Sequence, residues 1–170
     1  MGNIMDYIEW RGDLPFTQSE FNDVDNLILA CFSYVNLDGI QEAASQNGIE
    51  LKALTEKFLQ LHTEKELKED KSFIRFAPFM MLEMAKTERF GQCVIRNYVN
   101  EIVAEEAQQF SAVEICLSDG TSYISFRGTD DTIVGWKEDF NLSTGVVPAQ
   151  ERAVEYLRRI AGSLQEMVRV

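Results

Sequence analysis

The chain has 170 residues, of which 45% are hydrophobic, so it is long and apolar enough to bury the core of one domain and is not a disordered protein. Its 28 acidic residues outnumber its 16 basic ones, and the formal charge of −12 argues against binding to nucleic acid or to an anionic membrane. No signal peptide is visible and no apolar run is long enough to span a bilayer, so we expect a cytoplasmic protein without a membrane span.

The first part of the chain shows mostly helical patterns. Residues 1–16 look irregular, and three of them are expected to pack against the body of the protein: Trp10, Pro15 and Phe16. Thr17 and Glu20 have the spacing of a capping box, which predicts that a helix follows. The apolar residues of that helix recur at helical spacing and predict one broad stripe: Val24, Leu27, Ile28, Cys31, Phe32 and Val35.

Three further helices are predicted before the sheet begins. Asp38 is expected to cap a short helix that ends near Gly48, and Pro78 suits the first turn of a helix that runs to about Glu88. Between them, four residues mark the apolar side of another helix: Leu51, Leu54, Phe58 and Leu61. The sequence leaves two interpretations of the helical region 17–90, a lid over a lipid site or simple packing against the sheet.

The pattern then changes to strands. Three are predicted in succession: Cys93–Val103, Phe110–Ser118 and Thr121–Arg127. Asp119-Gly120 between two alternating runs is a strong hairpin signal, so the last two strands are expected to be antiparallel. Val113, Ile115 and Leu117 share one face of the middle strand.

Two helices are predicted after the strands, one from Asp131 to about Asn141 and a long one that Pro148 opens. The apolar side of the long helix comprises Val154, Leu157, Ile160, Ala161, Leu164 and Met167. Helices, an antiparallel meander and then strand–helix units predict an α/β protein of one domain. It is divided into a helical region at 1–90 and a sheet region at 91–170, and we expect the sheet to be incomplete at the C-terminus.

The stretch Tyr123–Asp139 predicts a strand, a tight polar turn and the start of a helix. Gly128 permits a sharp turn, and Thr129 and the two acids after it suit the first turn of a helix. Such a turn leaves backbone N–H groups aimed at one point, where a negative charge can be held. Plain helix capping is the simpler interpretation of the same residues.

No metal site or cofactor site is predicted. Cys31, Cys93 and Cys116 are scattered through apolar runs without the paired spacing of metal ligands, so we expect buried reduced thiols. The acid pairs Asp130–Asp131 and Glu138–Asp139 are adjacent along the chain, and adjacent side chains point away from each other on a helix, which disfavours one shared site.

Ser125-Phe-Arg-Gly-Thr129, followed by Trp136 and Asp139, resembles the oxyanion-loop signature of the class 3 lipases, which are α/β-hydrolase enzymes. The whole chain is similar to the Mbeg1-like family of lipase-like bacterial proteins. Three segments carry this similarity: Tyr7–Pro15, Phe21–Leu29 and Gly135–Ser143. The resemblance implies that residues 91–170 are the first part of an α/β-hydrolase sheet and that the activity of the parent family is hydrolysis of a lipid or small ester.

The resemblance also implies roles for five residues. Thr129 would supply a backbone N–H, and often a hydroxyl, to the oxyanion hole, and Asp139 would hold that hydroxyl in place. Trp136 would lie near the mouth of the site. Arg127 and Gly128 would shape the loop.

The catalytic triad of that family is absent from these residues. The resemblance implies a Gly-x-Ser-x-Gly nucleophile after the next strand, with the acid and the histidine later still. No serine here has that frame, since Gly162-Ser163 lacks the second glycine, and the only histidine, His62, precedes the oxyanion loop. We therefore expect the chain to be inactive by the family mechanism.

Two hypotheses follow. The first is the N-terminal portion of a lipase- or esterase-like serine hydrolase, which a C-terminal segment would complete. The second is a non-catalytic protein-binding or assembly module derived from a hydrolase, which would pair through an open sheet edge and form homo-oligomers.

Overall fold

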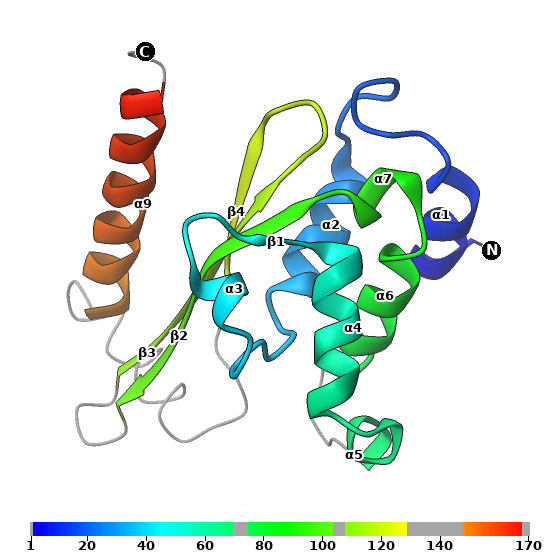
Figure 1. Cartoon of the computed structure of the whole chain (residues 1–170), viewed down its shortest axis with the longest axis horizontal. Coiled ribbons are helices and arrows are strands. Elements are labelled where there is room, and N and C mark those ends of the chain that lie inside the picture. Colours follow the sequence, from blue (N-terminus) through cyan, green and yellow to red (C-terminus); the bar gives the residue numbers. More distant parts are fainter. Residues whose placement is uncertain (1, 70–74, 104–107, 129–147, 168–170) are drawn as a thin grey trace. The chain divides into compact units, whose positions relative to one another are not determined.

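The computed structural model (Figure 1) describes residues 2–69, 75–103, 108–128 and 148–167. The chain divides into two compact units, and each is described here by itself. The first comprises Met1–Val99 and Ala112–Arg127, and the second comprises Asn100–Ser111 and Gly128–Val170. The protein is thus of mixed helix and sheet, as expected. No helix in the described ranges has both the length and the apolar character needed to cross a membrane.

The sheet has four strands in the order β1-β2-β3-β4: Ile49–Glu50, Val94–Val103, Gln108–Cys116 and Ser122–Phe126. The described helices are α1 Ile4–Arg11, α2 Asp23–Phe32, α3 Gln41–Ala44, α4 Leu51–Leu61, α5 Glu64–Glu69, α6 Ala77–Met84, α7 Glu88–Gly91 and α9 Pro148–Met167. In the first unit, the core is formed by side chains of α1, α2, α4 and α6 together with one face of the sheet.

The N-terminus is helical, and the expectation of irregular structure at residues 1–16 was wrong. Asn3 caps α1 by accepting hydrogen bonds from the backbone of Met5 and Asp6, and the Asp6 carboxylate accepts from the Asn3 N–H at 2.7 Å. Phe16 is buried as predicted. Trp10 was also predicted to pack against the body of the protein, but 68% of its surface is exposed.

The helix expected after Thr17 begins later than predicted. Asn22 and Asp25 form the capping box of α2, whereas Thr17 lies in a turn whose next N–H groups bond back to Pro15. The capping-box prediction at Thr17 was therefore wrong. The apolar stripe of α2 is also narrower than predicted, because Val24 and Leu27 are exposed.

The next helices follow the predicted order with local differences. Asp38 does not cap α3, whose N-cap is Ile40 with no side-chain hydrogen bond. Leu61 of α4 is exposed, while the other three predicted apolar residues of that helix are buried. Pro78 lies in the first turn of α6 as predicted, but α6 ends at Met84.

The three predicted strands are confirmed as β2, β3 and β4. Ala112 pairs with Phe126 and Cys116 with Ser122 in antiparallel register. The hairpin turns at Gly120, whose φ of 86° is in the left-handed region. The predicted buried face of β3 is also confirmed: Val113, Ile115 and Leu117 all join the core. The short strand β1 was not predicted and pairs antiparallel with the start of β2.

In the second unit, α9 begins at Pro148 as predicted. The Tyr156 ring contacts the Phe110 ring edge-on at 6.1 Å between centroids, and Arg152 pairs with Glu101 at 3.3 Å. Ile160 is buried. Val154 and Leu157 are exposed, so the helix does not bury the whole apolar side that its sequence indicated. The helix predicted from Asp131 to Asn141 lies outside the described residues.

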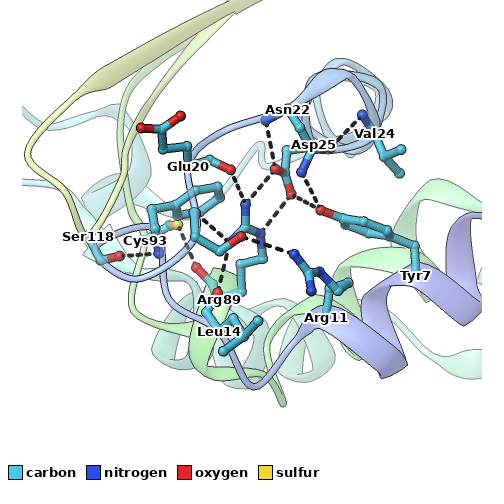
Figure 2. A network of polar contacts seen from close by, with 12 residues as sticks. Tyr7, Arg11, Leu14, Glu20, Asn22, Val24, Asp25, Arg89, Cys93 and Ser118 are labelled. Carbon is cyan, nitrogen blue, oxygen red and sulfur yellow. Dashed lines mark hydrogen bonds and ion pairs between the residues drawn. The ribbon is translucent and has the colours of Figure 1, made fainter.

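The first unit is held together by a buried arginine (Figure 2). Arg89 in α7 is fully buried, and its guanidinium binds both carboxylate oxygens of Asp25 at 2.8 and 2.6 Å. Its remaining N–H groups donate to the carbonyl oxygens of Leu14, Ser19 and Glu20 at 2.8 to 3.1 Å. All five donors of the guanidinium are therefore used.

Further side chains contact Asp25 and the guanidinium of Arg89. The Tyr7 hydroxyl donates to Asp25 at 3.1 Å and accepts from the Asn22 amide at 2.7 Å. The Phe16 ring lies 4.0 Å from the guanidinium carbon, in cation–π contact. The network therefore connects α1, the segment before α2, α2 itself and α7.

The first prediction concerns this ion pair. Replacing Arg89 by Met should lower the free energy of unfolding by about 3–5 kcal/mol, because Asp25 then stays buried without its counter-charge. Urea unfolding followed by circular dichroism measures the change. The matched control is Arg158→Met on the exposed side of α9, which should change stability by less than about 0.5 kcal/mol. Equal effects of the two substitutions would contradict a dominant role for the pair.

Candidate functional site

The candidate site is the end of β4, where the chain leaves the sheet at Arg127 and Gly128. On one side, β3 fixes β4 by the register given above. On the other, Tyr123 ties β4 to α2, because its hydroxyl donates to the Asn26 side chain at 2.7 Å and its ring lies 5.7 Å from that of Phe21. The start of β4 is therefore held by the helical layer, and β4 as a whole by its pairing with β3.

The structure describes two of the five predicted site residues. Arg127 is half-buried and Gly128 is exposed at the end of the strand. Thr129, Trp136 and Asp139 lie outside the described residues, so their roles stay predictions.

A tyrosine that the sequence reasoning missed is buried in β2, which β3 separates from β4 in the sheet. The hydroxyl of Tyr98, in β2, accepts a hydrogen bond from the Leu37 N–H at 3.3 Å and contacts the Asn36 side-chain oxygen at 3.5 Å. Burial is the main cause that raises its pKa to about 12. The charge of Asp38 acts in the same direction, and the nearby positive charge of Arg127 opposes it.

This environment determines what the Tyr98 group can do. At neutral pH the phenol is uncharged and donates a hydrogen bond, so it is not a general base. The Tyr98 side chain therefore ties the turn at Asn36 and Leu37 to β2.

A second polar cluster lies on the other face of the sheet around Glu114. This carboxylate is fully buried and accepts hydrogen bonds from Arg96 at 2.7 Å, from Asn97 at 2.7 Å and from Ser122 at 2.8 Å, and a longer one from the Cys116 thiol at 3.8 Å. Asn97 has a φ of 53°, an uncommon value for a residue other than glycine. The only signal for this cluster in the sequence is a lone acid between Val113 and Ile115.

The Glu114 cluster does not activate a nucleophile. Burial alone would raise the pKa of Glu114, but the hydrogen bonds from Arg96, Asn97 and Ser122 outweigh it and hold the pKa below its ordinary value of 4.5. An acid of lowered pKa is a weak base. Burial also raises the pKa of the neighbouring Cys116 thiol, which stays protonated at neutral pH.

The remaining candidates for chemistry lie apart from this strand end. His62 is the C-cap residue of α4, and its ring packs on Phe58 at 4.4 Å between centroids. Within the described ranges, no group of three or more His, Cys, Asp or Glu side chains is placed to hold a metal ion.

Comparison with known families places the chain. The model of the family described as Mbeg1-like matches residues 84–170, just over half of the chain. The chain belongs to the Mbeg1-like family. The matched region includes β2, β3 and β4, the Glu114 cluster and the whole predicted oxyanion loop. No curated protein and no solved structure matches the chain.

The second prediction concerns Glu114. Its folded-state pKa is depressed, so its contribution to stability is complete above the unfolded-state pKa and is lost as the pH falls through the folded-state pKa. Glu114→Gln should therefore cost about 1.5–3 kcal/mol at pH 7, and the difference from the parent protein should shrink below about pH 4.5.

Urea unfolding at a series of pH values tests this. The control is Glu56→Gln on the exposed side of α4, which should leave the pH profile close to that of the parent protein. A difference between Glu114→Gln and the parent that stays constant from pH 7 to pH 3 would show that the charge of Glu114 does not contribute.

Proposed function

We propose that this Mbeg1-like chain carries the oxyanion-loop portion of a lipase- or esterase-like serine hydrolase. The observation that carries the proposal is the confirmed hairpin, because β4 ends at Phe126 directly before Arg127-Gly128-Thr129 and within the family match. An oxyanion hole needs donors that are fixed in place, and a paired strand that ends directly before Thr129 would fix the start of such a loop.

The proposed chemistry is stabilisation of negative charge. Hydrolysis of an ester passes through an intermediate in which the former carbonyl oxygen is negative. Thr129 would donate both its backbone N–H and its hydroxyl to that oxygen, and Asp139 would orient the hydroxyl, which Thr129→Val removes. Trp136 would border the entrance, and Arg127 and Gly128 would set the path of the loop. One such donor is worth about 2.7–4 kcal/mol of transition-state stabilisation.

The nucleophile and the base of this mechanism would have to come from outside these 170 residues. No Gly-x-Ser-x-Gly frame occurs here, and His62 is engaged with Phe58 at the end of α4. The chain alone is then inactive, and a segment with the missing triad would complete an α/β-hydrolase sheet. A lipid or a small ester is the proposed substrate class, the proposed location is the cytoplasm, and no cofactor is required.

The third prediction tests this with p-nitrophenyl butyrate. The chain alone should have no phosphonate-sensitive activity, so a serine-reactive phosphonate should not change the rate at which p-nitrophenol is released. A fusion of Val170 to the corresponding following segment of an Mbeg1-like protein with a Gly-x-Ser-x-Gly frame should be active. In that fusion, Thr129→Val should lower kcat about 100-fold.

Thr121→Val, in the exposed hairpin, is the matched control and should leave kcat unchanged. Phosphonate-sensitive activity of the chain alone would show that a nucleophile is present within it. A fusion that is folded and inactive would argue against the hydrolase.

The second candidate function is a protein-binding or assembly module. β4 is last in the order of the described strands, so β3 pairs with one of its edges. The other edge of β4 can pair with a further strand. A second copy of the chain, or a separate C-terminal segment, would add that strand.

The fourth prediction separates this candidate from the first. Under the assembly proposal, light scattering coupled to size exclusion should give a mass of at least two chains. Ile124→Pro in β4 should shift the mass toward the monomer, because the Ile124 N–H points away from β3 and proline removes that donor from the outer edge of the strand. Gln46→Pro in the exposed bend after α3 controls for the cost of a proline. A monomer at all concentrations would exclude homo-oligomers.

A further inference from the structure

A groove lies in the first unit, alongside α1. It has a volume of about 380 Å³ and is formed between α1 and the end of α6 with the turn into α7. Its lining comprises Met5, Asp6, Ile8, Glu9, Glu83, Lys86 and Thr87. We call it the α1 groove.

The charge of the α1 groove is negative. Three of its side chains are carboxylates and one is an ammonium. Lys86 already pairs with Glu83 at 2.6 Å, and one oxygen of Asp6 accepts the Asn3 N–H in the cap of α1. Within the described part of the chain, Glu9 has no side-chain hydrogen bond or ion pair, and it is exposed. A cationic group is the complement of this lining.

The floor of the groove is apolar. Ile8 is buried in the core and Met5 is half-buried against it. The methylene stem of a lysine or arginine packs well on such a floor while its charged end reaches the carboxylates. Met is also a flexible side chain that adapts to different partners.

An exposed tryptophan stands beside the groove. Trp10 follows Asp6 by one helical turn, so the two share a side of α1. Its ring lies 3.4 Å from the position that a Cβ on Gly2 would take, and the Asp6 carboxylate lies 3.9 Å from the same point. With 68% of its surface exposed, Trp10 contributes little to the core. Exposed tryptophans are enriched among the residues that dominate binding energy, and they attract cations over their rings.

We propose that the α1 groove and Trp10 dock a segment of a partner protein that presents arginine or lysine between apolar residues. The basic side chain would lie between Glu9 and Asp6, and an apolar neighbour would cover Trp10. Nucleic acid and anionic lipid carry phosphates, which these carboxylates repel.

The fifth prediction uses the peptide acetyl-Leu-Arg-Leu-Leu-Arg-Leu-amide as probe. In the ¹⁵N-labelled protein, the indole N–H signal that is missing in Trp10→Ala identifies Trp10 among the two tryptophans. The chemical shift of that signal should change as peptide is added and reach a plateau at saturation. Glu9→Lys should weaken binding about tenfold, because it reverses the one carboxylate without a partner.

Glu56→Lys on the exposed side of α4 is the matched control, with the same change in net charge outside the groove lining. Equal weakening by the two variants would mean that only overall acidity acts and would overturn the proposal. Equal binding of acetyl-Leu-Glu-Leu-Leu-Glu-Leu-amide would overturn the role of charge. If the Trp10 signal shifts with phosphatidylglycerol vesicles and does not shift with the basic peptide, the partner is a lipid surface and not a protein segment. Urea unfolding of both lysine variants verifies that they are folded.

Discussion

The first unit depends on one interaction, the ion pair between Arg89 and Asp25. Two buried charges cost several kcal/mol each in desolvation, and this cost is offset only when the remaining polar groups are also satisfied. Here they are, because the three donors of Arg89 that Asp25 does not use bind the carbonyls of Leu14, Ser19 and Glu20. That segment has no strand or helix to satisfy its carbonyl groups, so the guanidinium takes the place of secondary structure. The position of α1, and with it of the groove and Trp10, follows from this arrangement.

The sheet could be predicted from the sequence because its signals are local. An alternation with a period of two and an Asp-Gly turn fall within about twenty residues. The N-terminal helix was missed because α1 mixes charged and aromatic residues without a clear apolar stripe, and its capping box uses Asn3 and Asp6 in place of the usual Ser or Thr and Glu or Gln. The Arg89 network was missed because its partners lie 64 to 75 residues away along the chain, and no pattern in the sequence reports a contact at that range.

The sequence signals of the candidate site are local in part, and the roles of its residues stay predictions. Arg127 and Gly128 belong to a continuous motif, and the structure describes both at the end of β4. Tyr98 lies in β2 and finds its hydrogen-bond partners in the 36–38 turn, and Glu114 lies in β3 and finds a partner in β2. The partners of each residue therefore come from a separate segment of the chain. A tyrosine or a glutamate within an apolar strand is a weak signal by itself. The two clusters also behave differently, since Tyr98 stays a neutral donor while Glu114 stays ionised.

The position of Arg89 has a consequence for the boundaries of the protein's folding unit. The family match begins at residue 84 and includes Arg89, while Asp25 and the three carbonyl groups lie upstream of it. A fragment cut at that boundary would expose an arginine whose partners had been removed, together with the apolar faces of β2 and β3 that the N-terminal helices cover. The part of the chain that sequence comparison delimits is therefore shorter than the part that can fold, and an expression fragment should begin before α1.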